Sequence, residues 1–425
     1  MFDRVNDLSD SLIGGGDGDV DLDPTAFAEL LENGEQPQHV LASDSVEHET
    51  DGRTTTVEPE GDHAAYLLVT DERVVILLGD QPDEAEIAFE MDTITTCDVD
   101  SGLLNETVVV GHDAESVTFS PTAGDLETTA TYVETVAETY RTVEGAIETA
   151  MERLEALEER IREDEPTENR LVRTRSKLSE ARHEAANAEL APREKLGERV
   201  TEAEAEFERR YVTTWLDRGE EALETAESAS EGDYETFCEA YTTAATAADT
   251  LGNVDERFDH VPESLLDRVD ALVEGVSGLD TRYVEATRNA IDAAEDADDP
   301  ETAVSHWLEA YRRYAAAHEA DWERTADLPE LSTEYELEDV AEHTVEALVE
   351  HAEQLEDEGE NREDEDAEAA RSLYEDAAER LKSAQGIAEE WTSVDSADAF
   401  ETQLATLEEK VDRTKWEWGS PGDTE

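Results

Sequence analysis

The stretch that decides the fold is Ala64–Pro121, which reads AAYLLVTDERVVILLGDQPDEAEIAFEMDTITTCDVDSGLLNETVVVGHDAESVTFSP. Short apolar runs are separated by turn residues, and within the last run Val117 and Phe119 alternate with polar side chains. This period of two is typical of half-buried strands. Together with strands near His39 and Arg53, about seven short strands predict a small antiparallel barrel or sandwich.

The order of these elements resembles that of the bacterial and archaeal pleckstrin-homology-like (PH-like) domains, which are related to GRAM domains. A short helix ending LLENGEQPQHVLAS comes first, and a long helix follows the strands. Leu67–Arg73 (LLVTDER) matches the hydrophobic–Thr–Asp–x–Arg pattern of that family. The resemblance covers residues 25–145 and implies a small barrel plugged by its C-terminal helix.

The resemblance leaves lipid and protein ligands open, and the loop that would decide between them is acidic. PH domains that bind phosphoinositides use a basic loop between their first two strands. The matching loop here, Ser43–Thr56, offers Arg53 against Asp44, Glu47, Glu49 and Asp51. Because a clustered phosphate needs several converging cations, we expect protein docking instead of inositol-lipid binding.

The charge of the chain points to a solvent of high salt concentration. The formal net charge is −83 over 425 residues, from 115 acidic and 32 basic side chains. Self-repulsion at that density opposes a compact state, and molar salt screens it. We therefore expect the cytoplasm of an extreme halophile. A disordered chain is the alternative, but 38% of the residues are hydrophobic and they recur periodically. This charge also disfavours nucleic acid and an anionic bilayer as partners.

From Leu126 the hydrophobic period changes. Apolar residues from Leu126 to Ile161 recur with a mean spacing of 3.5, the coiled-coil repeat. A second run, Leu171–Tyr211, follows a stop at Pro166, and Pro192 and Gly197 should bend it. The two runs predict an antiparallel coiled-coil hairpin of roughly 55 Å. An intermolecular dimer is the alternative.

The tip of this predicted hairpin concentrates basic residues. A functional interpretation is a contact for an acidic partner, including a second copy of this chain. The other interpretation is pairing with glutamates three or four residues away, which we favour. The candidate contact residues are Arg160, Arg162, Arg170, Arg173, Arg175 and Lys177.

Residues 212–415 predict stacked helical hairpins. Tyr241, Tyr311 and Tyr374 occupy similar alanine-rich helices, 70 and 63 residues apart. This residue pattern is similar to that of tetratricopeptide (TPR) hairpins. However, the repeat of that family is 34 residues long, and its Trp and Gly signature is missing here. Trp215, Trp307, Trp322 and Trp391 are expected to pack in cores. Gly359–Asp366 is expected to be a solvated loop.

No motif for catalysis, a cofactor or a metal is present. Cys97 and Cys238 are isolated, which fits a reduced compartment. His39, His48, His63 and His112 are scattered over the β region, and His343 and His351 lie eight apart without a third ligand. The Gly-rich linker before Pro24 fails the spacing of a calcium loop. We expect no cofactor, no metal and no enzymatic activity.

The sequence therefore predicts an α+β multidomain protein: a PH-like barrel, a coiled-coil hairpin and a TPR-like helical domain. We expect a scaffold or adaptor, with protein partners and self-association through the arm. The alternative is a peripheral membrane protein that uses the PH-like domain and the Phe2–Leu12 helix. The N-terminus lacks the pattern of a signal peptide, and no run is long enough to span a bilayer. The predicted boundaries are 1–23, 24–145, 146–211, 212–415 and 416–425.

Overall fold

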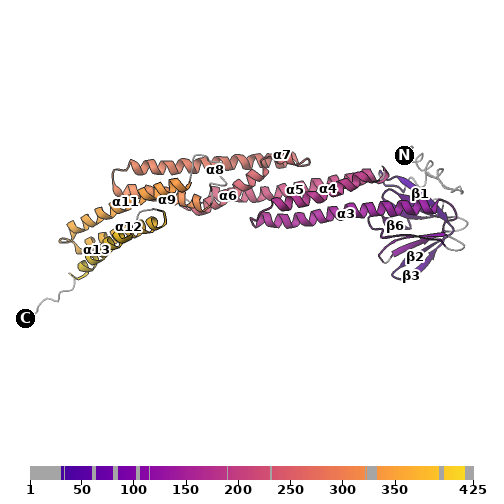
Figure 1. Ribbon diagram of the computed structural model, residues 1–425, viewed down its shortest axis with the longest axis horizontal. Helices are drawn as coiled ribbons and strands as arrows, with labels where there is room; N and C mark the ends of the chain where they lie inside the picture. The colour runs from indigo at the N-terminus through magenta and orange to yellow at the C-terminus, as the bar shows by residue number, and fades with distance from the viewer. Residues whose placement is uncertain are drawn as a thin grey trace, which may run out of the picture. The chain divides into compact units, whose positions relative to one another are not determined.

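The computed structural model consists of two compact units, and each structural statement below concerns only its described residues. The units are Met1–Tyr211 and Val212–Glu425, and their boundary falls inside helix α5 (Leu190–Ser228). The first unit combines sheets with helices and the second is helical, which confirms the α+β class (Figure 1). The predicted lead-in helix and the tail beyond Trp416 lie outside the described residues. The described residues are 30–32, 34–59, 64–79, 85–101, 106–113, 115–188, 190–229, 232–320, 322, 333–391 and 397–416.

The strands of the first unit form two antiparallel sheets. The first sheet has the order β1-β4-β5-β6 and the second has the order β3-β2-β9-β8-β7. Because β6 and β7 both lie at sheet edges, the two sheets do not close into the single barrel that we predicted. The strand bounds are β1 Pro37–Ser43, β2 Val46–Thr50, β3 Arg53–Val57, β4 Ala65–Thr70, β5 Arg73–Leu78, β6 Ile87–Glu90, β7 Thr96–Ser101, β8 Glu106–His112 and β9 Glu115–Phe119.

The chain changes from the first sheet to the second between β1 and β2. The Ser43 hydroxyl lies within hydrogen-bond distance of the carbonyl oxygens of Ser45 (2.9 Å) and Ser120 (2.7 Å), which holds this bend. β2 then pairs with β3 across a turn at Asp51 and Gly52, whose φ values are 51° and 74°. Positive φ at both central residues is the feature of type I′ hairpins.

The interpretation of Ser43–Thr56 as a loop is therefore wrong. Most of it is the β2–β3 hairpin, and Arg53 is the exposed first residue of β3. The Asp51-Gly52 dipeptide was a hairpin signal in the sequence. The acidic character of the segment is unchanged by this correction, because it depends only on composition.

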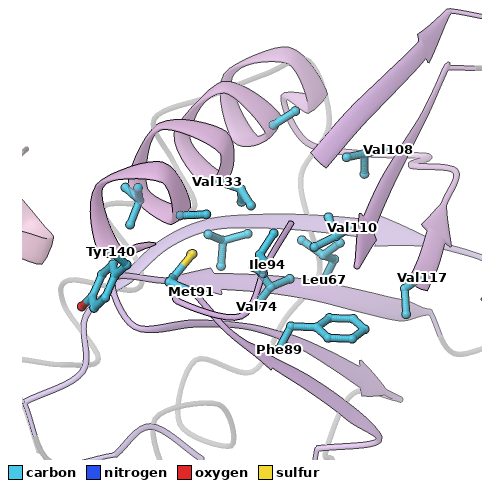
Figure 2. Close-up of a cluster of buried hydrophobic side chains, with 14 of the residues drawn as sticks. Leu67, Val74, Phe89, Met91, Ile94, Val108, Val110, Val117, Val133 and Tyr140 are labelled. Atoms are coloured by element: carbon cyan, nitrogen blue, oxygen red, sulfur yellow. The ribbon is translucent and has the colours of Figure 1, made fainter. Parts of the chain in front are cut away.

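The core of the first unit lies between the two sheets and helix α3 (Leu126–Arg162). Figure 2 shows Leu67 and Val74 of the first sheet and Val110 of the second in one cluster with Val133 and Tyr140 of α3. These side chains are 1% exposed or less. Burying them stabilises the unit by about 1.5–3 kcal/mol for each large apolar side chain.

The central strands β4 and β5 of the first sheet are buried on both faces. All six residues of β4 are buried, and Tyr66, Leu68 and Val75 form a second cluster with Leu31. A strand buried on both faces reads as a continuous apolar run instead of an alternating one. This explains why β4 (AYLLVT) lacks the period of two that β9 shows.

The residues that carry the family resemblance hold the β4–β5 hairpin. The Thr70 hydroxyl oxygen accepts a hydrogen bond from the Arg73 backbone N–H (3.0 Å), and Asp71 Oδ1 accepts one from the Gln36 N–H (2.6 Å). The Arg73 guanidinium forms a two-bond contact with the carboxylate of Glu35 (2.9 and 3.0 Å). The LLVTDER pattern thus ties the segment before β1 to the sheet.

Three helices extend the first unit: α3, α4 (Glu168–Asn187) and the first part of α5 (Figure 1). The prediction of one bent helix over Leu171–Tyr211 is wrong. At Ala188 the chain adopts φ −57° and ψ 161°, which ends α4. Pro192 lies in the first turn of α5, where a missing N–H costs nothing.

Hydrogen bonds and ion pairs between the three helices show their relative directions. α4 returns antiparallel to α3, and Arg153 Nη1 donates to the Arg173 carbonyl oxygen (3.1 Å). α5 reverses again, because Arg199 pairs with Glu144 (2.6 Å) of α3 and Arg210 pairs with Glu158 further along the same helix. α3, α4 and the first part of α5 are therefore three helical segments, where the sequence predicted two.

The second unit consists of helices that pack against their neighbours in sequence. α9 contacts α6, α8 and α11, and α12 contacts α11 and α13. Asp233 and Asp299 cap α6 and α9, because their side chains accept hydrogen bonds from the N–H groups of Thr236 and Thr302. The helix bounds are α6 Tyr234–Leu251, α7 Val254–Arg257, α8 Glu263–Glu295, α9 Pro300–Glu319, α11 Thr333–Arg362, α12 Ala367–Trp391 and α13 Ala397–Trp416.

The predicted solvated loop at Gly359–Asp366 is wrong in its first half, because α11 continues to Arg362. A Cβ at Gly359 would lie 2.5 Å from Cε1 of Tyr374. Glycine therefore allows α11 and α12 to approach each other with the Tyr374 ring between them. The glycine that suggested a loop serves helix packing.

The three similar tyrosines are not equivalent. Tyr241 and Tyr374 are buried, but Tyr311 is only half-buried, and Tyr314 is the buried tyrosine of α9. Tyr314 donates a hydrogen bond to Glu336 (2.9 Å). Among the predicted core tryptophans, Trp215, Trp307 and Trp322 are buried and Trp391 is half-buried.

Candidate functional site

The six cationic residues singled out in the sequence lie where α3 ends and α4 begins, and we call residues 160–177 the arm tip. Arg160 and Arg162 belong to the last turn of α3. The other four lie on α4, which also carries the exposed Val172. These four are Arg170, Arg173, Arg175 and Lys177.

Three of these cations form ion pairs with glutamates in or next to the arm tip. The side chain of Arg160 donates two hydrogen bonds to the Pro166 carbonyl oxygen (3.2 and 3.1 Å). The ion pairs join Arg160 to Glu165, Arg162 to Glu158 (3.7 Å) and Lys177 to Glu180 (2.6 Å). For Arg162 and Lys177 this is the pairing at three- or four-residue spacing that the sequence predicted, whereas the partner of Arg160 lies five residues away.

Arg170 and Arg173 differ from the others. Both are exposed, and neither side chain forms an ion pair or hydrogen bond with any residue that the structure describes. Val172 between them is 68% exposed, the largest value among the exposed large apolar residues. The arm tip thus combines two uncompensated positive charges with one exposed apolar side chain.

A second candidate site is a pocket in the second unit, which we call the aromatic pocket. It has a volume of about 490 Å³ and is formed by the end of α5, the start of α6, and the middle of α8 and α9. Its aromatic walls are Tyr234, Phe237 and Tyr283. The charged residues at the pocket are Glu227, Asp233, Arg282 and Arg313.

Arg313 lies among the rings of the aromatic pocket. Its guanidinium carbon is 4.9 Å from the centre of the Tyr234 ring and 5.8 Å from that of Tyr283. Its Nη2 donates to Glu309 (2.9 Å), and its Nε is buried without an acceptor among the described residues. Leaving a buried guanidinium donor without a partner costs free energy. An acceptor that entered the pocket and bonded to this Nε would remove that cost.

The Tyr283 hydroxyl is committed to the structure of the second unit. It donates a hydrogen bond to the Arg313 carbonyl oxygen (2.8 Å) and lies 3.4 Å from the Cys238 sulfur. Burial raises the pKa of Tyr283, and burial also raises the pKa of the Cys238 thiol to about 12. Neither group ionises near neutral pH, so neither offers a nucleophile.

Two of the four β-region histidines come together, which the sequence did not predict. His48 Nε2 lies 2.8 Å from Glu115 Oε1, and His112 Nε2 lies 3.7 Å from the other carboxylate oxygen. His39 packs against the Tyr132 ring, and His63 lies outside the described residues. Within the described ranges, no three His, Cys, Asp or Glu side chains form a group that could hold a metal ion.

The remaining sites set aside in the sequence lie in structural surroundings. His343 stacks on Trp307 with ring centres 5.0 Å apart, and His351 is buried with a lowered pKa caused mainly by burial. Burial also raises the pKa of Cys97 to about 12. No helix in the described part of the chain combines the length and the apolar character needed to cross a membrane.

Sequence analysis located the arm tip but missed the aromatic pocket. The pocket residues come from four helices, and a period of 3.6 shows which face of a helix is buried without showing which faces meet. No family model, no curated protein and no solved structure matches this chain.

Proposed function

We propose that this chain is a non-enzymatic adaptor whose arm tip docks on an acidic surface of a partner protein. The observation that carries this proposal is that Arg170 and Arg173, on either side of the exposed Val172, form no ion pair with any residue in the described part of the chain. Cations are scarce in a chain with 32 basic and 115 acidic side chains. Partner carboxylates would form charge-assisted hydrogen bonds with both guanidinium groups, and the partner would cover Val172.

The first unit supports a PH-like docking domain as the second element of the adaptor. β1 continues into β2, and β4 and β3 pair with them in turn, so a long hairpin crosses both sheets. The strands are followed by α3, which packs on β7, β8 and β1. The antiparallel α3–α4 pair serves as the coiled-coil spacer of this proposal.

The acidic surface supports a working environment of molar salt. A cytoplasm of that kind would screen the self-repulsion of a net charge of −83. The proposal predicts that helical circular dichroism collapses when KCl falls from molar to about 0.1 M, where the screening length grows to about 10 Å. Cooperative melting that is unchanged at low salt would contradict it.

Charge reversal at the arm tip tests the docking proposal. The variant Arg170→Glu/Arg173→Glu is compared with Arg312→Glu/Arg362→Glu, which alters the net charge equally on exposed positions of α9 and α11. We expect affinity purification in molar KCl to lose at least one partner from the arm-tip variant only. Sedimentation of the purified chain shows whether that partner is a second copy. Identical partners and identical sedimentation for all three proteins would overturn the proposal.

A further inference from the structure

We propose that the aromatic pocket binds an aromatic carboxylate. This inference does not depend on the arm tip or on the PH-like relation, because all its residues belong to helices of the second unit. Three features support it: the walls of the aromatic pocket, the position of Arg313, and the buried Nε of that side chain, which has no acceptor among the described residues.

The walls favour a flat apolar group. Phe237 and Tyr283 are stacked with ring centres 4.9 Å apart and an interplanar angle of 7°, and Tyr234 meets Tyr283 edge-on. Leu279, 4% exposed, adds an aliphatic wall. The volume of about 490 Å³ lies in the range of small-molecule sites, and aromatic side chains of this kind contribute dispersion and ring contacts.

Arg313 excludes a cation as the preferred ligand. An aromatic cage for a quaternary ammonium would need free ring faces. Here the guanidinium already lies within 6 Å of the centres of Tyr234 and Tyr283, so the positive charge that such a cage would bind is supplied by the protein. A second cation would meet this charge at close range.

The same side chain favours an anionic acceptor. Glu309 accepts from Nη2 of Arg313, which leaves the buried Nε without an acceptor among the described residues. A carboxylate that reached Nε would satisfy this donor with a charge-assisted hydrogen bond. Arg282 adds a second guanidinium at the pocket, while the Asp233 carboxylate is engaged in capping α6 through the Thr236 N–H.

The test is isothermal titration calorimetry of the full chain in molar KCl with 1-naphthoate. Its uncharged and cationic counterparts, 1-naphthylmethanol and 1-naphthylmethylamine, are titrated in parallel. We expect 1-naphthoate to bind at least about tenfold more tightly than either, which is the effect of one hydrogen bond to a charged group. Equal affinity for the three probes, or no binding of 1-naphthoate, would overturn the proposal.

Variants assign the binding to the aromatic pocket. Arg313→Met removes the donors and keeps the side-chain volume, and Arg312→Met changes the exposed neighbour on the same helix. Ala286→Phe fills the pocket from α8 and decides the question if Arg313→Met does not fold, with Ala271→Phe as its exposed control. We expect a loss of at least about tenfold in both pocket variants and none in the controls. Unchanged affinity in the pocket variants would refute the assignment.

The carboxylate can belong to a free metabolite or to the last residue of a polypeptide. A titration with an acetylated peptide that ends in a free Trp carboxylate, and with its C-terminal amide, separates the two sources. Tighter binding of the acid than of the amide identifies a chain terminus as a ligand. Binding of 1-naphthoate without either peptide identifies a small molecule. Either result supports the proposal, and the failure of all carboxylates contradicts it.

Discussion

The β4–β5 hairpin of the first unit and the aromatic pocket of the second unit each bury an arginine, but they satisfy it differently. Arg73 donates through Nε and Nη2 to both carboxylate oxygens of Glu35, and Nη2 also reaches the Leu30 carbonyl oxygen (3.0 Å). Arg313 has one ion pair, with Glu309, and its Nε has no acceptor among the described residues. The donors of Arg73 that are named here are thus satisfied by acceptors of this chain, without a ligand.

The difference separates a structural arginine from one available to a ligand. The pKa of Arg73 is raised, mainly because of its hydrogen bond to Glu35, whose side chain is fully buried. Removing either partner would leave an uncompensated charge. Arg313 is held chiefly by ring contacts that methionine can partly replace. Experiments on the two arginines should therefore give opposite results for stability and for binding.

The largest expected effect is the loss of the hairpin contact. Arg73→Leu leaves the Glu35 carboxylate buried without its cation, and we expect it to lower the free energy of unfolding by about 3–5 kcal/mol. Hydrogen exchange of β4 and β5 measures the loss, with the exposed Arg53→Leu as the control. If the two variants exchange alike, the structural role of Arg73 is wrong.

The second expected effect is a gain in stability when Asp71 is replaced, and its size depends on pH. Burial raises the pKa of Asp71 from 3.8 to about 6, so unfolding releases a proton at intermediate pH and the ionised carboxylate opposes folding. The penalty is absent below about pH 4 and complete above about pH 6. Asp71→Asn keeps an oxygen for the Gln36 N–H.

We expect Asp71→Asn to stabilise the first unit by about 2–3 kcal/mol at neutral pH and to have little effect near pH 4. Hydrogen exchange of β1 and β4 at the two pH values measures this, with the exposed Asp44→Asn as the control. Destabilisation at neutral pH would show that the ionised carboxylate supports the hairpin instead.

A smaller effect is expected in the second unit, at the contact between α11 and α12. Gly359→Ala places a methyl group against the Tyr374 ring, which should cost about 1–3 kcal/mol in overpacking. Gly386→Ala, a helical glycine of α12 with no atom near its Cβ position, should gain up to about 1 kcal/mol. Tryptophan fluorescence during urea unfolding measures both, and two changes of the same sign would contradict the packing argument.

The sequence predicted elements whose local period is unambiguous. Strands lie near His39 and Arg53 as predicted, and α3 begins at Leu126, where the period changes. In each case the side chains next along the chain decide the conformation.

Other features depend on contacts that a local pattern does not contain. The reversal at Ala188 was missed because the apolar spacing continues through it on both sides, and Pro192 suggested a bend in place of a new first turn. The glycine at Gly359 is explained only by the ring of Tyr374. The aromatic pocket brings together α5, α6, α8 and α9, so its residues share no spacing along the chain.

The most direct test of the contrast between the two arginines is urea unfolding of the full chain with and without 1-naphthoate. All six tryptophans follow residue 212, so their fluorescence reports on the second unit. The account predicts that the ligand raises the urea midpoint by mass action in wild type and Arg73→Leu, but not in Arg313→Met. An equal shift in Arg313→Met, or no shift in wild type, would contradict it.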